Sequence, residues 1–246
     1  MTSGLTVTFV GSGDAFGSGG RLQACILLDD GEQRLLLDCG ATSLVGLKRL
    51  VVDPNSINGI VLSHLHGDHF GGVPFLVLDG QFARRTRELA VWGPPGTAAR
   101  LQQALELMFP GSTGVERRFA VRVTEVAPGT DTEVLGWRLE TFAADHPSGA
   151  PALITRVTAD GRVVAYSGDT AWTSALVDAS DGADLFICES YFRDRQVPYH
   201  LGHAELLVHL PQLSCKRLVL THMTAEMLAA DNIAIEKAHD GLVIRL

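Results

Sequence analysis

The sequence predicts a single α/β domain, and three observations lead to that prediction. The chain has 246 residues, of which 46% are hydrophobic and 20% charged, as is ordinary for a soluble globular protein with a sizeable core. Apolar runs of strand length alternate with segments whose apolar residues have helical spacing. No low-complexity linker divides the chain. One larger domain over residues 1–246 is therefore favoured over two small ones.

The first half of the chain starts with strands. Residues 5–10 alternate in the way that strands do, and an Asp-Gly pair at 30–31 predicts a hairpin between the next two strands. Proline and glycine then bound the helical segments. Strands are expected at 5–10, 22–28, 33–37, 59–62 and 88–92, and helices at 41–51, 75–82 and 97–109.

The second half is richer in strands. Residues 117–126 and 133–144 alternate apolar with polar side chains, which predicts two antiparallel strands around the turn at 128–131. A second Asp-Gly pair, at 160–161, joins two further strands. Strands are expected at 152–157, 162–166, 185–188 and 217–220, helices at 172–177, 204–210 and 224–230, and closing apolar segments at 233–235 and 242–246.

Composition narrows the classes of function. The start of the chain has no basic region followed by a long apolar segment, and no run approaches the length of a membrane span, so a cytoplasmic protein is expected. The four cysteines are scattered without a C-x-x-C pair, which favours reduced thiols. A net charge of −8 argues against a large non-specific nucleic-acid surface.

Two weaker features leave alternatives open. The glycine-rich stretch at 11–21 follows a strand, but the third glycine of G-x-G-x-x-G would fall at Phe16, so a dinucleotide site is not predicted. The stretch is either a loop that lets substrate approach the backbone or a flexible surface loop. Arg84, Arg85 and Arg87 form a basic cluster that is either a solvated edge or a receptor for an anionic substrate.

The strongest signal is the stretch S-H-L-H-G-D-H-F-G-G-V-P at 63–74. It places His64, His66, Asp68 and His69 within six residues, directly after the apolar strand at 59–62. Imidazole and carboxylate groups are ligands that suit zinc and neighbouring metals. Side chains alternate in extended chain, so the first two histidines face the same way, and a turn at Gly67 can direct the other two ligands to a second centre. Two metals about 3.5 to 4 Å apart would form a hydrolytic site.

Three further ligand-type residues follow the carboxyl ends of apolar strands. They are His146, Asp169 and His222. Strand ends that gather at one edge are where α/β folds place their chemistry.

The H-x-H-x-D-H motif, with F-G-G-V-P after it, resembles the metallo-β-lactamase superfamily and its ribonuclease Z-like, phosphodiesterase-like branch. The resemblance implies a four-layer αββα sandwich of two mixed sheets flanked by helices, and a binuclear hydrolase with two divalent metals, zinc first and manganese or iron as alternatives. The first metal would take His64, His66 and His146. The second would take Asp68, His69 and His222, with Asp169 bridging the two.

Three more residues resemble the catalytic groups of that branch. Glu189 and His203 are similar to the acid and histidine that ribonuclease Z-like phosphodiesterases keep beside their metals, and His200 is the alternative to His203. On this hypothesis the metals lower the pKa of a shared water, and the resulting hydroxide attacks phosphorus. Asp68 orients that nucleophile, and His203, oriented by Glu189, assists departure of the leaving alcohol.

The expected substrate is a small phosphodiester, such as a cyclic nucleotide or a nucleotide ester. Cleavage of transfer RNA at its 3′ end is less favoured, because the segments before His146 contain no long basic insertion that could grip it. Hydrolysis of a lactone, a thioester or a sulfate ester is an alternative, since a fold does not determine a substrate. A non-catalytic metal-binding module is a further alternative, and β-lactam hydrolysis is not favoured. A homodimer is possible, and no membrane partner is expected.

Overall fold

The computed structural model describes residues 4–246, and the strands of this range form two sheets of seven strands each. The first sheet has the order β14-β1-β2-β3-β4-β5-β6, and the second has the order β13-β12-β11-β10-β9-β8-β7. The first sheet consists of β1 (Thr6–Gly11), β2 (Cys25–Asp29), β3 (Arg34–Leu37), β4 (Gly59–Val61), β5 (Leu89–Gly93), β6 (Val121–Glu125) and β14 (Val243–Arg245). The second consists of β7 (Asp131–Val134), β8 (Trp137–Ala143), β9 (Leu153–Ala159), β10 (Arg162–Tyr166), β11 (Leu185–Glu189), β12 (Leu218–Thr221) and β13 (Glu236–Lys237).

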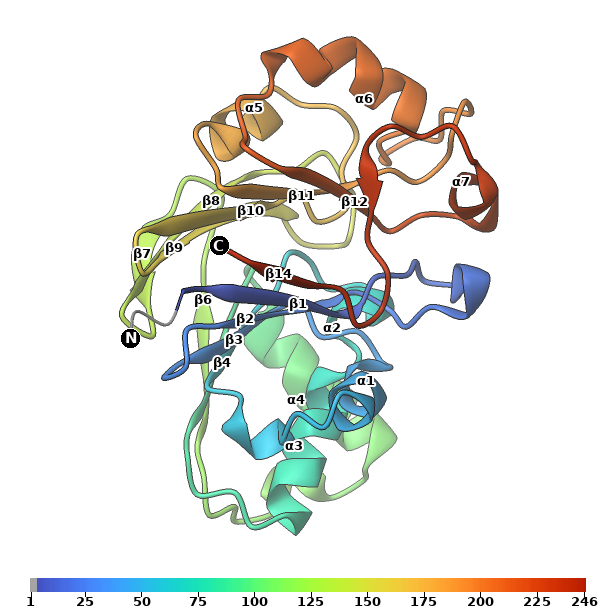
Figure 1. Ribbon diagram of the computed structural model, residues 1–246. Helices are drawn as coiled ribbons and strands as arrows, with labels where there is room; N and C mark the ends of the chain where they lie inside the picture. The colour runs from blue at the N-terminus through green and yellow to red at the C-terminus, as the bar shows by residue number, and fades with distance from the viewer. Residues whose placement is uncertain (1–3) are drawn as a thin grey trace.

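Helices cover the outer face of each sheet, so the molecule has four layers (Figure 1). One side carries α1 (Ser43–Arg49), α3 (Val73–Phe82) and α4 (Thr97–Met108), whereas the other carries α5 (Ala175–Ser180), α6 (His203–His209) and α7 (Ala225–Ala229). Three separate apolar clusters fill the spaces between these four layers. The expected αββα sandwich is confirmed.

The cluster between the two sheets is the central core. Phe9 and Leu37 enter it from the first sheet, and Val157 and Ile187 enter it from the second. Alternate residues of each strand point into this layer, because successive side chains of a strand lie on opposite faces. Burial of these side chains supplies most of the free energy that holds the sheets together.

Parallel pairing brings the functional strand ends to one edge. Strands β3, β4, β5 and β6 are parallel neighbours in the first sheet, and β10, β11 and β12 are parallel neighbours in the second. The carboxyl ends of parallel neighbours lie at the same edge of a sheet. The segments that follow β3, β4, β10, β11 and β12 therefore have their first residues near one another.

The expectation of a single antiparallel pair from residues 117–144 is wrong. Strand β6 instead pairs in parallel with β5 in the first sheet, and the turn at 128–131 leads into the second sheet. Residues 131–143 divide into the hairpin β7–β8 at Leu135 and Gly136, which both have positive φ. Alternation identified strands here, but it carries no information about which strand is the partner.

Smaller differences concern element bounds. Helix α5 begins three residues later than expected. The apolar segment expected at 233–235 is not a strand, and the short strand β13 begins directly after it. The four cysteines are free thiols, as expected. Within residues 4–246, no helix is both long and apolar enough to cross a membrane.

We predict that Phe9→Ala lowers the free energy of unfolding by roughly 3 to 5 kcal/mol, because a fully buried phenyl ring between the sheets is lost and a cavity remains. Phe82→Ala is the matched control, since that ring is 77% exposed and its removal should change stability by less than about 0.5 kcal/mol. Urea unfolding followed by circular dichroism measures both. Equal losses in the two variants would contradict the assignment of the central core.

Candidate metal centre

The segment after β4 places four ligand-type side chains at the functional edge. His64 is the third residue after the strand and is fully buried, whereas His66 is exposed. Residues Gly67–Phe70 form the short helix α2, where a loop was expected, and it carries Asp68 and His69. The backbone here packs closely on the first sheet, because a Cβ at Gly40 would lie 2.1 Å from the carbonyl oxygen of Asp68. A glycine is therefore required opposite this turn.

Three histidine nitrogens meet in a first donor set. His66 Nδ1 lies 3.2 Å from His64 Nε2 and 3.1 Å from His146 Nε2. The other ring nitrogen of His146, Nδ1, lies 2.9 Å from the carbonyl oxygen of Tyr199. A carbonyl oxygen only accepts, so Nδ1 carries the proton and Nε2 offers a lone pair to the set.

Two carboxylates and two histidines meet in a second donor set. Asp68 Oδ2 lies 3.3 Å from His69 Nε2 and 3.2 Å from His222 Nε2. Asp169 completes the set, with oxygens 3.2 Å from His69 Nε2 and 3.5 Å from His222 Nε2. All four side chains are buried.

Asp169 lies between the two sets. Its Oδ2 is 3.9 Å from His64 Nε2 and 4.0 Å from His146 Nε2, and it is also close to the second set. One carboxylate with an oxygen near each group of donors is the arrangement of a bridging ligand. The seven residues that the sequence singled out as ligands are thus brought together by the fold.

The donor chemistry fits divalent cations. His69 Nε2 and Asp169 Oδ1 are buried 3.2 Å apart, yet neither has a hydrogen-bond partner in the described structure. Burial and the neighbouring His69 hold the pKa of His64 well below its usual value, so that ring is neutral. Burial lowers the pKa of His222, but Asp169 and Asp68 outweigh it and raise the pKa to about 9. Carboxylates that attract a proton this strongly attract a cation in the same way.

Glu189 and His200 adjoin the second donor set. His200 Nδ1 lies 3.0 Å from Glu189 Oε2 and 3.9 Å from Asp169 Oδ2. The Tyr191 ring stacks on the His200 ring, with centroids 4.6 Å apart. Burial would lower the pKa of His200, but the hydrogen bond and the charge of Glu189 raise it above its usual value. His200 therefore tends to hold a proton beside the donor sets.

The expected pairing of Glu189 with His203 is not present in residues 4–246, where Glu189 contacts His200 instead. Tyr199 has positive φ and turns the chain back toward the site, and Leu201 N donates to Glu189 Oε1. These contacts keep His200 at the edge. His203 is the first residue of α6, and its buried Nδ1 has no partner in the described structure. Two histidines only three residues apart could not be distinguished from sequence.

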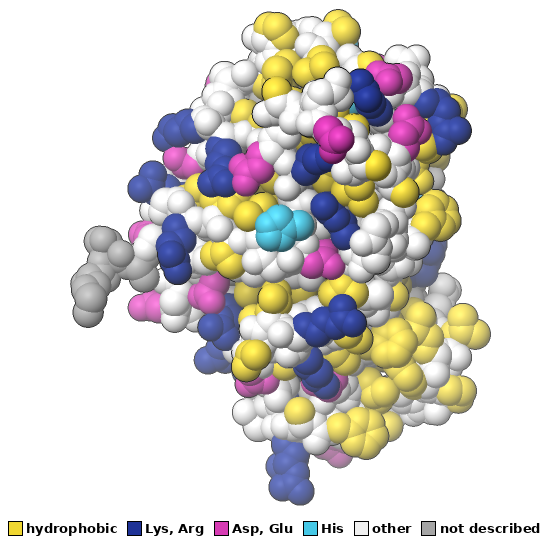
Figure 2. Space-filling model, turned by 45° about the vertical axis from the view of Figure 1, so that its right-hand side comes forward, with side chains coloured by type: hydrophobic (Ala, Val, Ile, Leu, Met, Phe, Trp, Pro, Cys, Tyr) yellow, Lys and Arg dark blue, Asp and Glu magenta, His cyan; other side chains and the backbone are white. Residues whose placement is uncertain are grey.

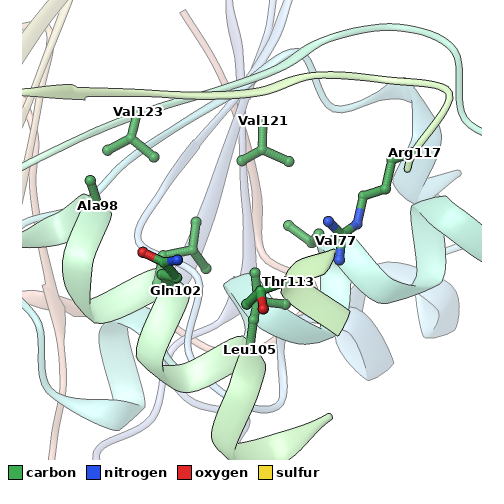
Figure 3. Close-up of a pocket in the computed structure, with 9 residues that line it drawn as sticks. Val77, Ala98, Gln102, Leu105, Thr113, Arg117, Val121 and Val123 are labelled. Carbon is green, nitrogen blue, oxygen red and sulfur yellow. The ribbon is translucent and has the colours of Figure 1, made fainter. Parts of the chain in front are cut away.

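Two other features lie apart from this site. The Arg85 guanidinium is buried and donates to the carbonyl oxygens of Ile57 and Glu88, next to the amino ends of β4 and β5, so it serves the fold. A hollow of about 260 Å³ between α4 and β6 is lined mainly by apolar side chains (Figure 3). None of the nine residues that line it in the described structure is His, Cys, Asp or Glu, so it offers no metal ligand.

Sequence reasoning missed the residues that orient the ligands. Asp38 accepts from His69 and from Ser63, and Tyr199 accepts from His146 through its backbone. The only available signal was a polar residue, Asp38, at the end of an apolar strand. That signal is the same one that identified three of the ligands.

Comparisons with known proteins agree with this geometry. A family model described as Anti-Pycsar protein Apyc1 matches residues 5–243. A ribonuclease Z of Methanosarcina acetivorans is 25% identical over 273 residues, covering 90% of this chain and 88% of the relative. Human tRNase Z, short form, has a TM-score of 0.80 at 24% identity, covering 97% of this chain and 98% of its own. The metallo-β-lactamase fold protein YhfI from Bacillus subtilis has a TM-score of 0.79 at 21% identity, covering 99% and 100%.

The family model spans almost the whole chain, including the residues of both donor sets. The curated relative and the two solved structures share the fold over nearly their full lengths. The chain belongs to the family of the Anti-Pycsar protein Apyc1, within the ribonuclease Z-like branch of the metallo-β-lactamase superfamily.

Proposed function

We propose that this chain is a metal-dependent phosphodiesterase that hydrolyses a small phosphodiester, such as a cyclic nucleotide. The observation that carries the proposal is the Glu189–His200 pair beside the second donor set. Hydrolysis of a diester expels an alcohol, and an alkoxide needs a proton as it leaves. A protonated histidine that faces the donor sets supplies one.

The two donor sets would hold two divalent cations. The first would be bound by His64, His66 and His146, and the second by Asp68, His69 and His222, with Asp169 shared. Imidazole and carboxylate ligands suit zinc, and manganese or iron are accepted by the same set. When bound, such cations lower the pKa of water and stabilise charge on phosphoryl oxygens.

The protein's own side chains orient the attacking water and protonate the leaving group. Asp68 is held by His69 and His222, which keep its pKa low although burial raises it, so it is an ionised acceptor that can orient the attacking water. His200 donates the proton to the leaving oxygen. Glu189 Oε2 and the Tyr191 ring keep the His200 ring in one orientation.

Several observations support a small substrate. A hollow of about 360 Å³ adjoins Asp68, and Ala15 of the glycine-rich stretch and Met108 of α4 also line it. This volume is at the low end of the range for ligand sites. On the face shown in Figure 2, basic and acidic side chains are interspersed, whereas a nucleic-acid surface is normally basic. The alignment with the M. acetivorans relative spans 273 positions, more than the 246 residues of this chain, so that relative contains insertions that are absent here.

A second candidate is cleavage of a transfer RNA precursor. The names of the relatives, ribonuclease Z and tRNase Z, favour it. The two candidates use the same chemistry at phosphorus and differ in how much of the substrate the protein must hold.

We predict two divalent ions per chain, with one lost in His146→Ala and the other lost in His222→Ala, because His146 belongs to the first donor set and His222 to the second. Elemental analysis after dialysis measures this. Saturating metal should also raise the free energy of unfolding by about 2.7 kcal/mol at a free concentration of 100 Kd. Retention of both ions in both variants would contradict the assignment.

We predict that His200→Gln slows hydrolysis of a 3′,5′-cyclic nucleotide by about 100- to 10,000-fold, with metal content unchanged, because an alkoxide then leaves unprotonated. Bis(p-nitrophenyl) phosphate should lose far less activity, since p-nitrophenolate leaves without a proton. His203→Gln is the control and should change kcat by only a few fold on either substrate. A larger loss of activity in His203→Gln than in His200→Gln would contradict this assignment and identify His203 as the proton donor.

The substrate class is tested with the metal-loaded protein on four compounds: a cyclic nucleotide, a transfer RNA precursor with a 3′ trailer, a lactone and a sulfate ester. We expect the highest kcat/KM for the cyclic nucleotide. Exclusive cleavage of the precursor would refute the small substrate but keep the phosphodiesterase. Turnover of the lactone or the sulfate ester alone would refute the phosphodiesterase itself.

A further inference from the structure

Asp38, which the proposed reaction does not use, is the most highly bonded carboxylate beside the metal centre. It follows β3, is fully buried, and has a left-handed backbone conformation with φ of 59°. Its Oδ1 accepts from the backbone N–H of Ser63 at 2.7 Å. Its Oδ2 has three partners, which are Ser63 Oγ at 2.7 Å, His69 Nδ1 at 2.6 Å and Tyr166 Oη at 2.8 Å.

These contacts determine where the ring proton of His69 is. An ionised carboxylate only accepts hydrogen bonds, so His69 Nδ1 must carry the proton that lies between them. In a neutral ring, Nε2 then has a free lone pair. That nitrogen is the one that lies 3.3 Å from Asp68 and 3.2 Å from Asp169, in the second donor set.

The same carboxylate determines the proton of His64 through Ser63. Ser63 Oγ lies 2.7 Å from Asp38 Oδ2 and 3.0 Å from His64 Nδ1. A hydroxyl group has one proton, and the carboxylate can only accept it, so the hydroxyl oxygen must accept from His64 Nδ1–H. His64 Nε2 is therefore free to face His66 Nδ1, 3.2 Å away in the first donor set.

We infer that Asp38 is a positioning residue that sets the tautomer and ring orientation of one histidine in each donor set, directly for His69 and through the Ser63 hydroxyl for His64. This inference rests on the proposed metal centre, but it concerns only the protein's own hydrogen bonds. In metal sites generally, a hydrogen bond to the ring nitrogen that does not bind the metal orients a ligand histidine. Loss of such a hydrogen bond lowers metal affinity by about 10- to 100-fold.

The third partner of Asp38 ties the second sheet to this arrangement. Tyr166 is the last residue of β10, and its hydroxyl reaches Asp38 across the central core. Burial and the charge of Asp38 raise the pKa of Tyr166 well above its usual value, so the hydroxyl remains a donor. Asp38, at the end of β3, is therefore bonded to Tyr166, at the end of β10 in the other sheet, as well as to His69 and, through Ser63, to His64.

The test uses zinc affinity, measured by competition with a chromophoric chelator in two single-site backgrounds. His222→Ala disrupts the second donor set and keeps the first intact, whereas His146→Ala disrupts the first and keeps the second intact. Ser63→Ala should weaken zinc about 10- to 100-fold in the first background and leave the second unchanged. Ser180→Ala removes another fully buried serine hydroxyl, far along the chain in α5, and should change neither.

Asp38→Asn should weaken zinc in both backgrounds. An amide presents one acceptor oxygen and one donor nitrogen, so in either orientation a donor faces a donor among the four contacts. Histidine ring ¹⁵N spectra of the metal-free protein provide a second readout. In Ser63→Ala only the His64 ring should lose its fixed Nδ1 proton, and the His69 ring should keep its own.

Equal weakening of both sites by Ser63→Ala, or of neither, would overturn the inference, as would a His64 tautomer that does not change. If Asp38→Asn fails to fold, the Ser63 variant alone decides. Neither readout requires turnover. Two well-bound zinc ions with the expected pattern but no diester hydrolysis would therefore refute the proposed function and leave this inference intact.

Discussion

The convergence of electron-rich atoms at one edge of the sandwich is the constraint on which the rest of the structure depends. Nitrogens and carboxylate oxygens from two sheets lie within 3.1 to 3.5 Å of one another, and most of them are buried. Lone pairs at that spacing repel unless positive charge lies between them, and burial removes the water that would screen them. The protein must therefore hold these groups rigidly, and positive charge, from protons such as that on His222 or from bound cations, must lie among them.

The backbone at this edge is held in an unfavourable conformation at three positions, which requires that the surrounding structure hold it there. Asp38, Tyr199 and His222 are not glycines, yet each has positive φ, a conformation that costs of the order of 1 to 3 kcal/mol. Each one supports the site. Asp38 accepts from the ligand His69, the carbonyl oxygen of Tyr199 accepts from the ligand His146, and His222 is itself in the second donor set. The two sheets fix these positions because their central core packs as one unit.

The sequence predicts those parts of the site whose residues lie close together along the chain, and it does not predict contacts between residues that are far apart along it. The four ligand-type residues at 64–69 are local, and the other three stand at ends of apolar strands, so spacing and strand pattern identified them. Asp38 and Tyr166 are 128 residues apart and meet only through the packing of the two sheets, which no local pattern encodes. The same limit explains the partner of β6, which depends on sheet order, and the choice between His200 and His203, which depends on one turn at Tyr199.

The charge balance at the edge favours a small anion over a long one. Two divalent cations would bring four positive charges, which balance the buried carboxylates of Asp38, Asp68, Asp169 and Glu189. The proton that His200 tends to hold would then leave the centre weakly positive within a chain whose net charge is −8. Screening confines that local attraction to about 8 Å at physiological ionic strength. A single phosphodiester fits within this distance, whereas a polyanion extends beyond it, over a surface where basic and acidic side chains are interspersed, as on the face in Figure 2. The net negative charge of the chain would therefore favour the small substrate of the proposed function over a polyanion.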